Sequence, residues 1–352
     1  MIQLYLSQYS VLPAVPTQFT ISDAEVSVEV SINLQGQNIY TTTLLEHNGS
    51  ATFYGFREIL RQNMLARRLP FGSLAIYVAH EDGMETLEDK YIIFAEALDI
   101  NDDRDMLWQR FLTTRSYYVM PKMYNLPLAF FSDNSEQFTA YADCVFKEED
   151  GTLRTYTFNR NIYHYNYPRI YYVYLSGYEI QNVIEQDEGG PVGTLLSYTF
   201  HVGPRSITVY MSDEPFEVDF NFYNSFNIME HIFVYGSTKL KSTFDRKEAS
   251  SQGITTFYDM NTTRKYEVET TPLTLEEASW FNEFLASPYV ERELNQDWQP
   301  TVLISDITSE ISDNAKDLVK IKFSWRYDDN AQYLDINRYP QVFSAPYNGA
   351  FK

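Results

Sequence analysis

The sequence predicts a mainly β protein of the α+β class, with two to three antiparallel β-sandwich or barrel-like domains that each carry at most one or two packed helices. Aromatic residues make up 16% of the chain, with 29 Tyr and 24 Phe among 352 residues. Such wide, flat side chains pack well on pleated sheets. Several segments alternate between apolar and polar residues, and two show helical spacing. Because single cores rarely grow beyond about 250–300 residues, we expect at least two domains.

The N-terminal segment is expected to be an arm followed by a sheet. Residues 1–20 lack a strong period, and Pro13 and Pro16 favour an arm over an edge strand. Every second residue within 26–34 is apolar, which predicts a strand buried on one face. Residues 39–45 are expected to pair with this strand.

A helix is predicted over about residues 54–69, because its apolar residues recur at helical spacing and Pro70 and Gly72 follow. Its other face is basic. In so acidic a chain this face is a candidate docking surface for a partner. The alternative is a solvated face paired with neighbouring carboxylates. The candidate interface residues on this face are Arg57, Arg61, Arg67 and Arg68.

Two further strands are expected at residues 74–79 and 91–97, joined by an acidic loop over 80–90. Residues 115–120 are expected to form the strand that leaves this region. The first domain is therefore predicted to span residues 1–120, as a small β-sandwich or barrel with one helix.

A β-rich middle domain is predicted over residues 121–215. An acidic stretch ending in glycine, residues 185–190, is expected to be a loop or hinge. Residues 148–151, Glu-Glu-Asp-Gly, predict a hairpin turn. The expected strands are 138–146, 153–158, 171–175, 195–202 and 206–211.

Tyrosines are dense within residues 161–167 and in the strand that follows. Tyrosine suits surfaces that are half apolar and half wet. We interpret the segment as a packing or subunit-contact surface. A carbohydrate-binding platform that uses residues 163–174 is the alternative. The candidate interface residues here are Tyr163, Tyr165, Tyr167, Tyr171 and Tyr172.

The C-terminal domain is predicted over residues 216–352. Residues 239–251 are polar and of mixed charge, which predicts a long exposed loop or a β-arm. Residues 328–352 have little periodicity, and we expect them to lie along the surface or to reach a neighbouring subunit.

A helix over about residues 274–286 is the best-specified element of the chain. Thr274 can serve as N-cap, and Glu277, three residues later, completes a capping box. Strands are expected at residues 301–305 and at 319–327, where apolar and polar residues alternate. We expect the helix to pack against an antiparallel sheet in this region.

The chain is strongly acidic, with a formal net charge of -21. This balance argues against binding to nucleic acid phosphates or to an anionic membrane surface. An acidic wall could still serve as a DNA conduit, because it repels phosphate and lets DNA slide. The N-terminus lacks the basic and apolar regions of a signal peptide, and no apolar run approaches the roughly 20 residues that span a bilayer. We expect the protein to remain where it is made.

The sequence offers no pattern that predicts catalysis, a cofactor or a metal site. The five histidines lie outside zinc-binding spacings, and no phosphate loop or nucleophile elbow is present. The acidic residues 101–105 lack the glycine and glutamate of a calcium loop. The single cysteine, Cys144, is expected to be a buried small hydrophobe. We therefore expect no enzyme.

Short motifs in the last third of the chain carry a resemblance to a known family. They lie at residues 222–226, 253–259, 271–274, 277–281, 302–306 and 321–326. Through these motifs the C-terminal third resembles virion structural proteins of Bacteroidetes-infecting tailed phages and their prophages. A weaker similarity covers residues 46–59. The resemblance implies a component of a tail, collar or baseplate that assembles as a ring and has no catalytic residues.

The sequence thus leads to the hypothesis of a non-enzymatic virion protein that is assembled in the host cytoplasm. It would form a homo-oligomeric ring, bind other virion proteins and read no nucleic acid sequence. A carbohydrate-binding or adhesion module is the alternative.

Overall fold

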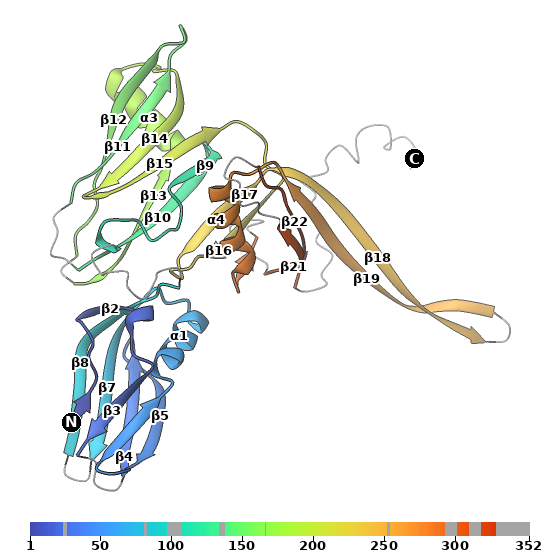
Figure 1. Ribbon diagram of the computed structural model, residues 1–352. Helices are drawn as coiled ribbons and strands as arrows, with labels where there is room; N and C mark the ends of the chain where they lie inside the picture. The colour runs from blue at the N-terminus through green and yellow to red at the C-terminus, as the bar shows by residue number, and fades with distance from the viewer. Residues whose placement is uncertain are drawn as a thin grey trace. The chain divides into compact units, whose positions relative to one another are not determined.

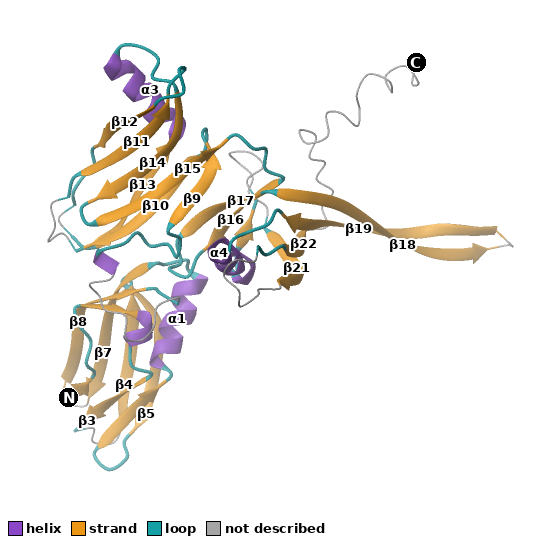
Figure 2. Cartoon of the chain, turned by 45° about the horizontal axis from the view of Figure 1, so that its top comes forward, coloured by secondary structure: helices purple, strands orange, loops and turns teal. Residues whose placement is uncertain are grey.

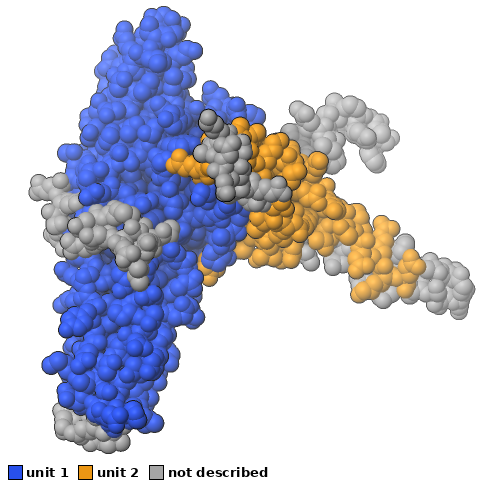
Figure 3. All heavy atoms as spheres, in the orientation of Figure 1, with its two compact units in different colours: residues 1–233, 279–288 blue, residues 234–278, 289–352 orange. Residues whose placement is uncertain are grey.

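The computed structural model describes residues 1–23, 27–80, 83–96, 107–133, 138–165, 167–251, 254–292, 301–309 and 318–328. The described chain is mainly β with several antiparallel sheets, which confirms the predicted fold class (Figures 1 and 2). It divides into two compact units (Figure 3). Unit 1 comprises Met1–Phe233 and Ser279–Pro288, and unit 2 comprises Val234–Ala278 and Tyr289–Lys352. The predicted division at residues 120 and 215 stays a prediction.

The N-terminal part of unit 1 is a β-sandwich. One sheet has the order β1 (Ile2–Gln3), β3 (Gln18–Ser22), β6 (Ser50–Tyr54). The other has the order β2 (Tyr9–Val11), β8 (Gly83–Ile93), β7 (Phe71–His80), β4 (Ser27–Leu34), β5 (Gln37–Leu45). Helix α1 (Phe56–Ala66) adds Phe56, Leu60 and Met64 to the core between them.

Two predictions for this part were wrong. The N-terminal 20 residues are not an arm, because β2 pairs in parallel with β8 and β3 pairs with β6, while Val15 and Phe19 are buried. A short 3₁₀ turn, Leu12–Ala14, accommodates the proline at position 13. Most of the expected acidic loop at residues 80–90 is strand β8, which pairs with β7 from His80↔Gly83 onward. Acidic residues are tolerated there because much of the strand is exposed.

The second part of unit 1 contains a five-stranded sheet and a separate antiparallel pair of strands. The sheet has the order β12 (Leu153–Arg160), β11 (Ala140–Lys147), β14 (Thr194–Val202), β15 (Arg205–Ser212), β9 (Tyr117–Pro121). Strand β10 (Asn125–Ser132) pairs with β13 (Arg169–Ser176) over their full length. Their inward faces share one apolar core. The segment expected to leave the first domain is β9, which pairs in parallel with β15.

Helix α3 (Gly177–Glu188) was not predicted, and residues 185–190 are not a hinge loop. Ser176 caps the helix by accepting a hydrogen bond from the backbone N–H of Glu179, and Ile180 and Ile184 are buried. Gly189 ends it at φ 76°, a conformation that suits glycine. The acidic stretch is therefore the last helical turn and its cap.

The third part of unit 1 is the hairpin of β16 (Val218–Tyr223) and β17 (Met229–Val234), against which helix α4 (Leu275–Ala286) packs. Phe284 of the helix stacks on Phe220 with ring centroids 5.3 Å apart. The expected packing of this helix on an antiparallel sheet is thus present, but β16 supplies the sheet surface.

Unit 2 contains a four-stranded sheet, β18 (Gly236–Ser251), β19 (Ile254–Thr270), β22 (Ile321–Tyr327), β21 (Val302–Ser309), and the short strand β20 (Val290–Glu291). Trp325 and Phe323 of β22 are buried. The capping box is confirmed: the Thr274 N–H donates to Glu277 and the Glu277 N–H donates to Thr274, at 2.8 and 3.2 Å. The tail at residues 329–352 and the loop at 101–105 lie outside the described residues.

Candidate assembly surfaces

Strands β18 and β19 form a long β-hairpin arm that extends from the sheet of unit 2 (Figures 1 and 2). The two strands have 16 and 17 residues and pair from Gly236↔Thr270 to Ser251↔Ile254. At roughly 3.3 Å per residue, each strand spans about 50 Å. This confirms the β-arm and excludes the exposed loop that the sequence left as the alternative.

Most of this arm is a ribbon of two strands. Strand β22 pairs with β19 only at residues 266–269. In the described chain, residues 241–251 and 254–265 therefore pair only with each other. Every side chain from Lys239 to Glu248 is exposed, including Phe244 at 55%. An isolated two-stranded hairpin is at best marginally stable in water, and its unpaired edges are open to another chain.

The arm also differs from the rest of the chain in charge. Residues 236–265 contain six basic and three acidic residues, whereas the whole chain carries -21. The basic members with described side chains on β18 are Lys239, Lys241, Arg246 and Lys247. The acidic excess thus lies entirely outside the arm.

The basic face of α1 lies against its own unit. Arg57 Nε donates to the Val15 carbonyl, and Arg67 Nη1 donates to the Leu34 carbonyl at 3.1 Å. Arg68 lies 5.0 Å from the ring centre of Tyr223. Arg61 follows the alternative interpretation, since it pairs with Glu58 at 3.5 Å and with Glu96 at 2.6 Å. A docking role for these four arginines stays a prediction, and their contacts within unit 1 favour a structural role.

The tyrosines predicted as an interface gather around one pocket beside β13. Tyr163, Tyr165, Tyr171 and Tyr172 line it, together with Arg169. Tyr167 adjoins this group, because its ring lies 5.6 Å from that of Tyr165. The structure therefore brings all five candidate tyrosines together.

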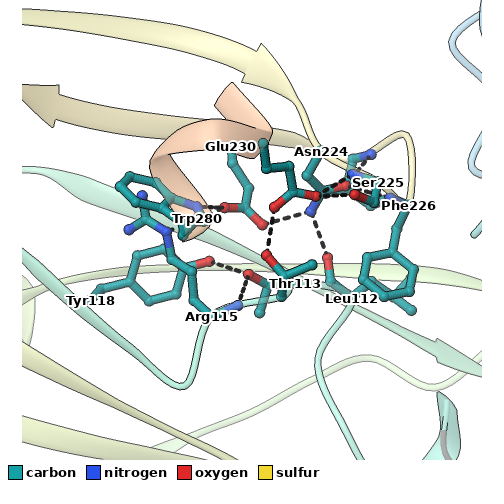
Figure 4. Close-up of polar contacts among 12 residues, drawn as sticks. Leu112, Thr113, Arg115, Tyr118, Asn224, Ser225, Phe226, Glu230 and Trp280 are labelled. Carbon is teal, nitrogen blue, oxygen red and sulfur yellow. Dashed lines mark hydrogen bonds and ion pairs between the residues drawn. The ribbon is translucent and has the colours of Figure 1, made fainter. Parts of the chain in front are cut away.

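A buried polar cluster, which the sequence did not single out, lies between three segments of unit 1 (Figure 4). Arg115 precedes β9, Glu230 lies on β17 and Trp280 lies on α4. The Arg115 Nε and Glu230 Oε2 atoms are 3.7 Å apart, and both side chains are less than a tenth exposed. The guanidinium is packed between the rings of Trp280 and Tyr118. The Trp280 Nε1–H donates to Glu230 at 3.4 Å.

Asn224, seen in Figure 4, and Glu283 of α4 extend this cluster to the β16–β17 turn. Asn224 Nδ2 donates to Glu230 at 2.6 Å and to the Leu112 carbonyl at 2.9 Å. Its Oδ1 accepts from the backbone N–H of Phe226. Glu283 of α4 accepts from the backbone N–H of Ser225 at 2.6 Å. The cluster therefore fastens the helix and the turn to the segment before β9.

Burial governs the charges in this cluster. It lowers the pKa of Arg115 to about 10, although the Tyr118, Glu230 and Glu283 groups favour the charged form. Burial raises the pKa of Glu230, and Arg115 opposes that rise. In both pKa shifts, the cost of removing the charged group from water outweighs the attraction between Arg115 and Glu230. The pair therefore holds the segments together without being a large source of net stability.

A pH dependence follows from the raised pKa of Glu230. Its ordinary value is 4.5. The Glu230 carboxyl binds its proton more tightly in the folded state than in the unfolded state. The stability that this proton contributes is therefore fully present below pH 4.5, and it is lost as the pH rises through the pKa of Glu230 in the folded state. Relative to a Glu230→Gln variant, the wild-type protein should lose stability as the pH rises above 4.5.

Urea midpoints of the wild-type protein and the variant, measured across this pH range, test the expectation. Glu149→Gln, which changes an exposed carboxylate, is the matched control and should parallel the wild type. A wild-type protein that gains stability over Glu230→Gln with rising pH would contradict the assignment.

The other residue types that often form functional sites give few candidates among the described residues. In the part of the chain that the structure describes, no three His, Cys, Asp or Glu side chains could hold a metal ion together. Cys144 is buried, as expected, and burial raises the pKa of its thiol to about 12. Among the described helices, none is long and apolar enough to cross a membrane.

Comparisons with known proteins add little to this geometry. No protein-family model and no curated protein matches the chain. Among solved structures, it is similar to the full extracellular region of plexin A4, at 9% identity and a TM-score of 0.20. That alignment covers 94% of this chain and 40% of the plexin chain. A likeness this remote assigns neither a fold family nor a function.

Proposed function

We propose that the chain is a non-enzymatic structural protein of a tailed-phage virion. It forms a homo-oligomeric ring in the tail, collar or baseplate and binds other virion proteins there. The resemblance of the C-terminal third supplies the virion context. The β18–β19 arm is the single observation that carries the assembly role.

The exposure of the arm supports a role in assembly. Its two-stranded part buries none of its described side chains up to Glu248. Ordering more than twenty residues costs on the order of 1–2 kcal/mol each in backbone entropy. Contacts with a neighbouring molecule would offset that cost by burying Phe244 and Leu240, which are 55% and 44% exposed.

Charge favours a second copy of this chain as that neighbour. A mildly basic arm meets an acidic surface on any other copy, and such complementarity speeds and orients association. Each arm that reaches the next copy makes a head-to-tail contact, and head-to-tail contacts close into rings when the rotation permits.

Light scattering across a concentration series tests assembly, at low salt and at 1 M salt. We expect a large species that gains mass with concentration and loses mass at high salt, because salt screens charge pairs. At low salt, the double variant Lys239→Glu with Lys241→Glu should also lower the mass of the assembled species. Lys90→Glu, on β8, is the matched control. A monomer under every condition would contradict a ring that forms unaided.

The virion context has its own test. Antibodies raised against the chain should label purified particles, from a culture that produces the protein, at one position on the tail axis. Labelling absent from particles but present in the cell lysate would exclude a virion component.

A further inference from the structure

The tyrosine pocket has the features of a ligand site as well as those of a contact surface. Its volume is about 270 Å³. This lies just below the roughly 300–1,000 Å³ of pockets for drug-sized ligands, which leaves room for one or two sugar rings. Tyr163 is 75% exposed beside it, and Tyr172 and Tyr174, two residues apart on β13, are 45% and 47% exposed.

These exposed rings are held by contacts beneath them. Tyr163 meets Tyr165 edge to face at 4.9 Å, and the backbone N–H of Tyr165 donates to the Tyr171 hydroxyl at 3.0 Å. Tyr171 is buried and stacks on Phe130 at 5.2 Å. The aromatic wall is therefore anchored in the apolar core, so little conformational entropy would be lost when a ligand stacks on it.

The charged groups that line the pocket are basic. Arg160, Asn161 and Arg169 line it, and none of its described lining residues is Asp or Glu. Arg160 is already paired with Glu179. Arg169 lies 4.0 Å from the ring centre of Tyr165, and its two hydrogen bonds, to Ile170 O and the Tyr167 hydroxyl, are both long at 3.4 Å. Its guanidinium is thus the positive group best placed to bind a ligand.

We propose that this pocket binds an acidic saccharide, with a sugar face against the tyrosine wall and a carboxylate on Arg169. The apolar face of a pyranose suits an aromatic ring, and a guanidinium fork matches a carboxylate. The Asn161 amide supplies donors and an acceptor for sugar hydroxyls. This inference goes beyond the ring proposal and does not depend on it. It gives a definite form to the carbohydrate-binding alternative raised by the sequence.

Two sugars that differ only in the carboxylate provide the test. Saturation-transfer NMR and titration calorimetry on the full chain would compare methyl glucuronide with methyl glucoside. We expect the glucuronide to bind at least tenfold more tightly. Equal affinity for the two sugars, or binding of neither, would overturn the proposal, whatever the oligomeric state of the protein.

Variants locate the binding. Arg169→Gln should remove the preference for the glucuronide, and Tyr163→Ala should weaken the binding of both sugars. Tyr54→Ala is the matched control, because Tyr54 is 71% exposed on β6 and distant in sequence from the pocket. Tyr163 is so exposed that its removal should leave folding intact, which thermal melting would verify. Unchanged glucuronide binding in both pocket variants would also overturn the assignment.

Discussion

Replacing Arg115 with alanine should lower the free energy of unfolding by about 3–5 kcal/mol, because it leaves a buried carboxylate without its partner. Glu230 is 3% exposed and depends on Arg115 for its nearest positive charge at 3.7 Å. The substitution also opens a cavity beside the rings of Trp280 and Tyr118. Urea unfolding followed by circular dichroism measures the loss.

The double variant Arg115→Met with Glu230→Leu distinguishes two effects: leaving Glu230 without its partner, and removing both charged groups. Since burial shifts both pKa values against the charged forms, replacing both groups with apolar ones should recover much of the stability that Arg115→Ala loses. Recovery should be incomplete, because the Asn224 and Trp280 donors lose Glu230 as their acceptor. A single Arg115→Ala variant that costs less than about 1 kcal/mol would show that the cluster does not hold unit 1 together.

Removing the outer part of the arm should abolish assembly and leave the fold intact. In this variant an Asn-Gly turn replaces residues 243–263 and joins the paired residues Ser242 and Arg264, so that the part of β19 that pairs with β22 is kept. We expect a monomer by light scattering at concentrations where the full chain forms its large species. The loss should be complete, because the deletion takes away the whole proposed contact.

Phe244→Ala provides a graded version of this deletion. It removes the most exposed large apolar side chain among the described residues of the arm, 55% exposed, and should weaken assembly without abolishing it. Met123→Ala, at a residue 72% exposed outside the arm, is the matched control and should assemble normally. An arm-deleted protein that still forms the large species would contradict the proposed role of the arm.

The sequence correctly predicted the elements that depend only on residues close together in the chain. The capping box at Thr274 and Glu277 and the alternation within β4 are properties of neighbouring residues, and both were confirmed. Helix α3 was missed because its buried positions, Ile180 and Ile184, lie among acidic and amide residues. The N-terminal strands were missed because their partners, β8 and β6, lie far along the chain.

The candidate sites also differ in whether the sequence reveals them. The tyrosine segment and the arm are visible in the sequence, because composition and charge mark them out. The buried cluster is not, since Arg115, Glu230 and Trp280 come from three separate parts of the chain. The segment at residues 222–226, which carries part of the virion resemblance, was the available signal: Asn224 within it is buried and hydrogen-bonded to Glu230.

Site-specific photo-crosslinking from position 244 tests the proposed assembly most directly. A photoreactive residue there, in the full chain under assembly conditions, should give dimers and higher crosslinked species, with peptides that map to one acidic surface of a second copy. Mixing isotope-labelled and unlabelled protein distinguishes crosslinks between copies from those within one chain. Crosslinks confined to single chains, at concentrations where large species form, would show that the arm does not join neighbouring copies.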